Sequence, residues 1–132
     1  MNAIAQQLAN HPSRDTFDTV ELARAIEACV EAAAVSAMCA DACLVDESDA
    51  DMRRCIQLDL DCATICTATA QVLSRPAPNG EVWRRLLETC ARACHACAAE
   101  CETHTRSKHC MTCADTCRRC EMACQQLLAV AA

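Results

Sequence analysis

Apolar and polar residues alternate along most of the chain at the spacing of amphipathic helices. Ala, Leu, Ile, Val and Cys recur three and four positions apart, and charged residues fill the positions between them. This pattern predicts four long helices at about 15–45, 49–74, 79–103 and 107–129, with a short helical preamble at 2–9. The chain is therefore expected to be all-α.

Turn-forming residues separate the expected helices. Residues 45–51 (VDESDAD) interrupt the periodicity, and Ser48 is the expected N-cap of the second helix. Asp18 and Glu21 suit the exposed N–H groups at the start of the first helix. The prolines and glycine of residues 75–80 (RPAPNG) end the second helix.

Short connections make successive helices antiparallel. The sequence thus predicts an up-down-up-down antiparallel four-helix bundle over residues 15–132, preceded by an N-terminal extension at 1–14.

Composition excludes several classes of function and location for the chain. A net charge of −6 without a basic stripe argues against a nucleic-acid partner. The longest apolar runs are too short for a membrane span, and the N-terminus lacks the basic and apolar regions of a signal peptide. A cytoplasmic location is expected.

Fifteen cysteines are the most unusual feature of the 132 residues. An odd number excludes complete disulfide pairing within one chain, and a reducing compartment keeps thiols free. All fifteen fall at the inward positions of the four helices: Cys29, Cys39, Cys43, Cys55, Cys62, Cys66, Cys90, Cys94, Cys97, Cys101, Cys110, Cys113, Cys117, Cys120 and Cys124. Ala32, Ser36, Asp59 and Thr69 occupy inward positions among them.

The antiparallel arrangement predicts layers of facing residues. The outermost layer contains Cys43, Cys55, Cys101 and Cys110, beside the first and third connections, and we call this end of the bundle the mouth. Four deeper layers follow, counted inward from the mouth: Cys39, Asp59, Cys97 and Cys113; Ser36, Cys62, Cys94 and Cys117; Ala32, Cys66, Cys90 and Cys120; Cys29, Thr69, Leu87 and Cys124. The opposite end is expected to be closed by an apolar plug of Ile26, Leu73, Trp83 and Leu128.

Metal binding explains this pattern better than packing or disulfides. Leu or Ile would fill the same volume without an oxidation hazard, and Cβ atoms at i,i+4 on a helix are too far apart for a disulfide. Six C-x-x-x-C pairs can each hold one ion between sulfurs on adjacent turns: Cys39/Cys43, Cys62/Cys66, Cys90/Cys94, Cys97/Cys101, Cys113/Cys117 and Cys120/Cys124.

Charge selects the metal. Zn²⁺ with four thiolates is doubly negative, and many such sites in a dry core would repel one another. Cu(I) with one bridging thiolate per ion is neutral, and thiolates favour Cu(I). We therefore expect multiple Cu(I) ions per chain. His104, His109, Met52 and Met111 lie near the mouth as further candidate ligands, and Asp59 is a candidate oxygen donor or proton acceptor within the column.

These features resemble the cytosolic branch of the bacterial copper storage protein family. The resemblance rests on four cysteine-lined helices, repeated C-x-x-x-C pairs and the missing export signal, and it covers nearly the whole chain after the preamble. It implies a non-enzymatic, high-capacity Cu(I) store, filled through a mouth carrying His104 and His109, and a homotetramer. A copper chaperone or a low-molecular-weight copper ligand would serve as donor or acceptor.

Other functions remain open at this point. A metallothionein-like protein could sequester zinc or cadmium, but it would need compact four-sulfur clusters. A thiol redox protein would need one activated cysteine pair rather than a column. An iron–sulfur carrier or a purely structural bundle would not need fifteen thiols.

Overall fold

The computed structural model describes residues 2–48 and 51–131, and these residues form helices and connections without a strand. In chain order the elements are α1 (Ala3–Ala9), the 3₁₀-helix η1 (Arg14–Thr16), α2 (Thr19–Leu44), α3 (Arg53–Leu73), α4 (Glu81–Cys101) and α5 (Lys108–Ala131). The sequence correctly predicts an all-α chain with four long helices.

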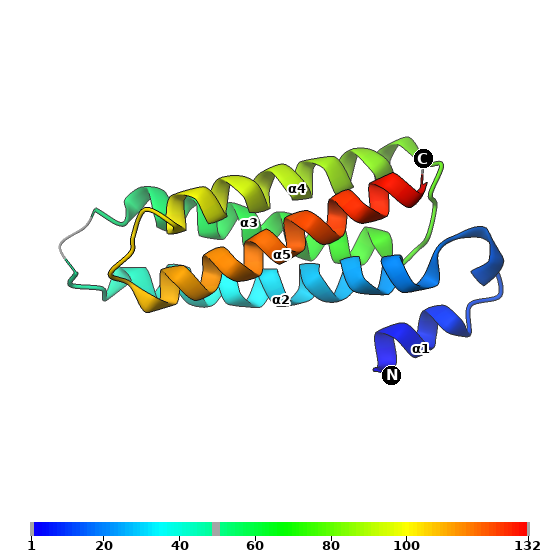
Figure 1. Cartoon of the computed structure of the whole chain (residues 1–132), viewed down its shortest axis with the longest axis horizontal. Coiled ribbons are helices and arrows are strands. Elements are labelled where there is room, and N and C mark those ends of the chain that lie inside the picture. The colour runs from blue at the N-terminus through cyan, green and yellow to red at the C-terminus, as the bar shows by residue number, and fades with distance from the viewer. Residues whose placement is uncertain (1, 49–50, 132) are drawn as a thin grey trace.

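The four long helices pack as an up-down-up-down bundle (Figure 1). Helix α2 contacts α3 and α5, and α4 contacts the same two helices, so each bundle helix has two neighbours. The α2–α3 and α4–α5 connections lie at one end, which is the mouth, and the α3–α4 connection and the C-terminus lie at the other (Figure 1). The predicted topology is confirmed.

Helix α2 begins later than its apolar pattern suggests. Asp18 is the N-cap, and its side chain accepts a hydrogen bond of 2.9 Å from the backbone N–H of Glu21. The predicted start at Asp15 is wrong because residues 14–16 form a separate 3₁₀ turn. Asp18 thus satisfies an exposed N–H group at the start of the helix, as the sequence indicates.

The N-cap assigned to Ser48 is also wrong. Helix α3 begins at Arg53 with Met52 at the N-cap position, and the backbone N–H of Arg53 donates to Oδ1 of Asp51 at 3.0 Å. Ser48 instead donates its backbone N–H to Oδ1 of Asp46 at 2.8 Å. The expected helix start at residue 49 lies outside the described residues.

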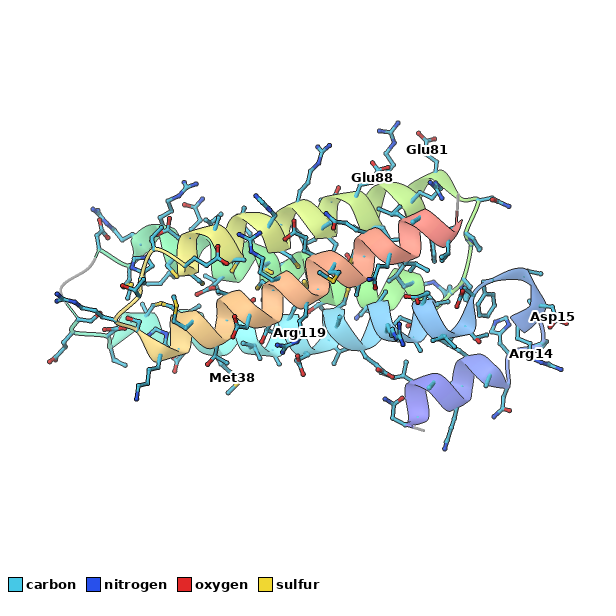
Figure 2. All side chains as sticks on the ribbon, in the orientation of Figure 1. Arg14, Asp15, Met38, Glu81, Glu88 and Arg119 are labelled. Carbon is cyan, nitrogen blue, oxygen red and sulfur yellow. The ribbon has the colours of Figure 1, made fainter. Side chains whose placement is uncertain are left out.

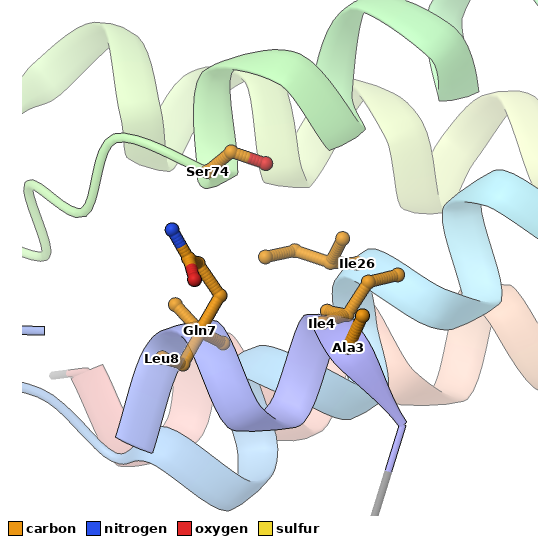
Figure 3. Close-up of a pocket in the computed structure, with 6 residues that line it drawn as sticks. All are labelled: Ala3, Ile4, Gln7, Leu8, Ile26 and Ser74. Atoms are coloured by element: carbon orange, nitrogen blue, oxygen red, sulfur yellow. The ribbon is translucent and has the colours of Figure 1, made fainter. Parts of the chain in front are cut away.

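Helix α1 packs against the side of α2, close to the plug end of the bundle (Figure 1). Its residue Leu8 is buried in the common core. An apolar pocket of about 350 Å³ remains between α1 and the bundle (Figure 3), and its lining contains no cysteine: Ala3, Ile4, Gln7, Leu8, Ile26 and Ser74.

The apolar plug is present, with one correction. Ile26, Leu73 and Trp83 are buried as predicted, but the fourth member is Leu127 and not Leu128. After the four-residue step from Cys120 to Cys124, the next inward position falls three residues later. Leu128 lies at the flank, partly buried against the core.

Charged side chains cover the outside of the bundle. Glu81 and Glu88 of α4 point away from it, as Figure 2 shows. None of the helices in the described residues combines the length and the apolar character that crossing a membrane requires.

Candidate metal centre

Every cysteine of the chain lies in the interior, and none takes part in a disulfide. Helix α2 supplies Cys29, Cys39 and Cys43, and α3 supplies Cys55, Cys62 and Cys66. Helix α4 supplies Cys90, Cys94, Cys97 and Cys101. Helix α5 supplies Cys110, Cys113, Cys117, Cys120 and Cys124. The three-and-four spacing therefore predicts the inward face of each helix correctly. We call this set the thiol column.

Sulfur atoms from different helices meet at the predicted depths. In the outermost layer, Sγ of Cys55 lies 3.7 Å from Sγ of Cys101 and 4.0 Å from Sγ of Cys110. Two layers further in, Sγ of Cys62 lies 3.8 Å from both Cys94 and Cys117. These contacts confirm the register of α3, α4 and α5. Helix α2 lies between the predicted layers, because Cys29 contacts Cys90 and Cys120 of the layer nearer the mouth.

The column continues toward the plug without a gap. Sγ of Cys66 lies 3.7 Å from Sγ of Cys90, which lies 3.8 Å from Sγ of Cys29. Sγ of Cys29 in turn lies 3.7 Å from Sγ of Cys120. Nearer the mouth, the carboxylate of Asp59 links Cys55 of the outermost layer to Cys113 further in, so the thiols and Asp59 together form one array from the mouth to the plug.

Several groups of four side chains could each hold an ion, because their ligand atoms all lie within 4.8 Å of one another. They include Cys29/Cys90/Cys120/Cys124, Cys66/Cys90/Cys94/Cys120, Cys39/Cys55/Cys101/Cys110, Cys39/Asp59/Cys101/Cys113 and Cys39/Cys43/His109/Cys110. Some cysteines belong to more than one group, as bridging ligands must.

The sulfur spacing favours bent or three-coordinate sites. Three thiolates around one ion at metal–sulfur distances of about 2.3 Å are separated by about 4.0 Å, whereas a linear pair requires about 4.6 Å. The pairs Cys62/Cys66 and Cys113/Cys117 are separated by 3.8 and 4.0 Å. Holding one ion in line within a C-x-x-x-C pair would therefore require these side chains to move apart.

Asp59 is fully buried among thiols in the second layer. Its Oδ1 accepts from Cys97 at 3.1 Å and from Cys113 at 3.4 Å, and its Oδ2 accepts from Cys55 at 3.8 Å. Burial raises the pKa of Asp59 to about 8, because the charged carboxylate loses its hydration. The side chain thus lies where an oxygen donor or a proton acceptor could act on neighbouring ions.

His109 joins the thiol column to the surface at the mouth. Its Nδ1 lies 3.5 Å from Sγ of Cys39 and 3.6 Å from Sγ of Cys110. Its Nε2 lies 2.6 Å from Oδ2 of Asp46. Hydrogen bonds from Ser48, Ser107 and His109 lower the pKa of Asp46 well below its usual range. His109 can therefore face a metal ion with one nitrogen while the other is held by a carboxylate.

His104 is placed differently. Its side chain is only 8% exposed, and its Nε2 lies 2.8 Å from Oε2 of Glu100, one turn earlier. Glu100 also pairs with Arg54 at 3.3 Å. His104 is thus near the mouth, as expected, but its Nε2 is directed at a carboxylate.

The two candidate methionines lie beside the column. Met52 is buried in the core at the start of α3, and Met111 of α5 is partly buried against it.

The sequence pattern does not identify Asp46 as a residue of the site. Its only sequence signal is its place in the acidic segment 45–51, which local periodicity identifies only as a connection.

Two thiols near the mouth, Cys110 and Cys43, are held in the neutral form in the metal-free chain. Burial raises the pKa of Cys110 to about 11, and it also raises the pKa of Cys43 above its usual range. Binding a cation as thiolate must therefore release a proton at each such ligand.

Comparison with known proteins agrees with this geometry. The sequence model of the family described as Csp, copper storage protein, matches residues 18–129. The copper storage protein Ccsp of Streptomyces lividans, in a structure loaded with 10 copper equivalents, is 44% identical with a TM-score of 0.90, covering 97% of this chain and 99% of that one.

Two further relatives are similar. A cytosolic copper storage protein from Streptomyces lividans, in a structure with five coppers, is 49% identical with a TM-score of 0.78, over 83% of this chain and 92% of that one. The cysteine-rich protein YhjQ of Bacillus subtilis (strain 168), described as uncharacterized, is 31% identical over 104 residues, which cover 79% of this chain and 93% of its own length.

Proposed function

This chain belongs to the copper storage protein family, and from that membership and the geometry of its core we propose that it binds many Cu(I) ions along the thiol column and stores them. The observation that carries this proposal is the array of fifteen buried thiols, most of which approach a sulfur of another helix at 3.6–4.0 Å. One ion per thiolate keeps the loaded core neutral. The capacity is therefore on the order of the number of thiols.

The ligands of this store are the fifteen cysteines, with His109 at the mouth. Sharing of Cys39, Cys90 and Cys120 between neighbouring ligand groups supports bridging thiolates. Asp59 contributes an oxygen next to the second layer, and His104, Met52 and Met111 are auxiliary ligands close to the mouth. Ions are taken up at the mouth, because the other end is filled by the plug.

The relatives support a biological setting for this store. The Streptomyces lividans protein with five coppers is cytosolic, which supports a cytoplasmic store here. The store is non-enzymatic, protects the cell against free copper, and exchanges ions with a copper chaperone or a small copper ligand. A homotetramer is expected by family resemblance, and exposed apolar side chains such as Val30 and Met38 on α2 offer surface for such contacts.

An anaerobic titration tests the proposal. Reduced, metal-free protein is titrated with Cu(I) in the presence of a strong competing chelator, and the bound ions are counted while circular dichroism follows the helix content. Binding of many equivalents with little change in helicity is expected. Saturation at one or two equivalents would overturn the proposal. A higher capacity and preference for Zn²⁺ would instead favour a metallothionein-like function.

A further inference from the structure

The connection between α2 and α3 holds the imidazole of His109 through Asp46. Oδ2 of Asp46 lies 2.6 Å from Nε2 of His109 and accepts a second hydrogen bond of 2.7 Å from the hydroxyl of Ser107. Oδ1 accepts the backbone N–H of Ser48 at 2.8 Å. Groups from the α2–α3 connection, the α4–α5 connection and the first turn of α5 thus meet on one carboxylate.

The opposite edge of the same ring faces the thiol column. Nδ1 of His109 lies 3.5 Å from Sγ of Cys39 and 3.6 Å from Sγ of Cys110. A surface pocket of about 310 Å³ between α2 and α5 adjoins this edge, lined by Val35, Met38, Cys39, Ala42, His109 and Thr112. The ring therefore lies between the carboxylate, the outer thiols and the solvent.

We propose that Asp46 is a positioning residue for copper capture, which fixes the tautomer of His109 so that the lone pair of Nδ1 faces Cys39 and Cys110. A carboxylate only accepts hydrogen bonds, and a neutral imidazole carries a single N–H. The N–H must therefore be on Nε2, directed at Asp46, and Nδ1 is left as the ligand atom. A carboxylate that orients a ligand histidine in this way is a frequent second partner of metal sites.

This inference rests on the proposed function, because Cu(I) is the ion that the lone pair would bind. It makes a specific claim about Asp46→Asn, a substitution of nearly the same shape. The backbone N–H of Ser48 cannot rotate or change its role, so the amide oxygen of the new side chain must face it. The amide NH₂ then faces Nε2 of His109 and the hydroxyl of Ser107.

In that arrangement the amide donates to Nε2, and the proton of the imidazole moves to Nδ1. The lone pair no longer faces the thiols. Asp46→Ala removes the constraint without imposing the opposite tautomer, so it should impair copper capture less than Asp46→Asn does. A residue that merely braces the connection would give the reverse order, because the asparagine variant keeps more of the contacts.

The test combines two measurements. The tautomer of His109 is measured in ¹⁵N-labelled, metal-free protein by long-range ¹H–¹⁵N correlation at pH about 8, where ordinary imidazoles are neutral. A His109→Gln variant identifies the signals. The affinity for the first Cu(I) equivalent and the total capacity are measured by chelator competition. Asp115→Asn, which changes an exposed carboxylate of α5, is the matched control.

We expect the Nε2–H tautomer in the wild type and in Asp115→Asn, and the Nδ1–H tautomer in Asp46→Asn. The first-equivalent affinity of Asp46→Asn should fall by about tenfold or more with the total capacity unchanged. An unchanged tautomer in Asp46→Asn, together with full capacity in the wild type, would overturn only the role of Asp46. A wild-type capacity of one or two ions would overturn the proposed function, and with it copper capture by His109.

Discussion

Oδ1 of Asp59 lies 3.1 Å from Sγ of Cys97, in the interior of the bundle, whereas the other acidic side chains that the structure describes are at or near the surface. A carboxyl group in this position loses its hydration and is surrounded by weak thiol donors. The loss of hydration raises the pKa of Asp59 to about 8 although the hydrogen bond from Cys97 opposes it, and the second layer of the column is therefore sensitive to pH.

The first prediction concerns Asp59→Asn in the metal-free protein. Between the unfolded pKa of 3.8 and the folded pKa of about 8, the native state binds more protons than the unfolded state. The free energy of unfolding therefore decreases as the pH rises through this window, by up to about 1.4 kcal/mol per unit. Asparagine does not titrate, so the variant should gain stability relative to the wild type from pH 4 to pH 8. Denaturant unfolding under reducing conditions measures the difference, and parallel pH profiles would contradict it.

A second prediction adds a ligand. Ser36 is fully buried, and its Oγ lies 3.5 Å from Sγ of Cys117 and 3.8 Å from Sγ of Cys113. Ser36→Cys replaces the hydroxyl with a thiol of similar size at a position already facing the column. Copper capacity should rise by about one ion per chain, counted by metal analysis after removal of excess copper. Ser74→Cys, at the exposed end of α3, serves as the control and should add no protected ion.

A third prediction removes ligands from the middle of the column. The double change Cys90→Ser and Cys94→Ser keeps side-chain volume but deletes two thiols that contact Cys66. Capacity should fall by about two ions, and the helix content should remain that of the wild type. Thr89→Ser on the exposed face of α4 is the control. An unchanged copper count would show that these thiols are not ligands.

Proton release provides a fourth test. Because burial raises the pKa of Cys110 to about 11, this thiol is protonated at pH 7. Each ion bound by a thiolate should displace about one proton, so uptake should weaken as the pH falls. A pH indicator in weakly buffered, anaerobic solution measures the number of protons per copper. Release of far less than one proton per ion would mean that the thiols do not bind as thiolates.

The fifth prediction separates the plug end from the column. Leu87 is fully buried where the column ends, and Leu87→Ala should lower the free energy of unfolding by about 2–5 kcal/mol through lost burial and a residual cavity. Val82→Ala changes a residue of α4 that is 74% exposed, and it should alter stability by less than about 0.5 kcal/mol. Thermal unfolding of the metal-free proteins gives both values. Copper capacity should remain that of the wild type, and a large loss in Leu87→Ala would show that the site depends on this end.

Much of the fold could be predicted from the sequence, because one physical pattern governs it. Inward residues three and four apart define the helix faces, and short connections leave one antiparallel register, which places Cys62 opposite Cys94 and Cys117. The same pattern could not decide between Leu127 and Leu128, because steps of three and four are both compatible with a helix.

The details of the mouth could not be predicted in this way. Asp46, Ser48 and Ser107 bond across two connections that are about sixty residues apart, so no local spacing links them. Ser48 has the right side chain for an N-cap, yet its hydroxyl bonds to the distant hydroxyl of Ser107 instead. A tertiary contact of this kind orients His109, whereas α3 begins beside a local bond from the backbone N–H of Arg53 to Asp51.

The plug of Ile26, Leu73, Trp83 and Leu127 makes the bundle a tube that is blind at one end. Ions that arrive at the His109 end would leave by the same route, so ions held in the outer layers lie between the deeper ions and the exit. A loaded chain would then release its outer copper first. Such a tube separates a fraction that is readily exchanged from a reserve deep in the bundle, without any second compartment.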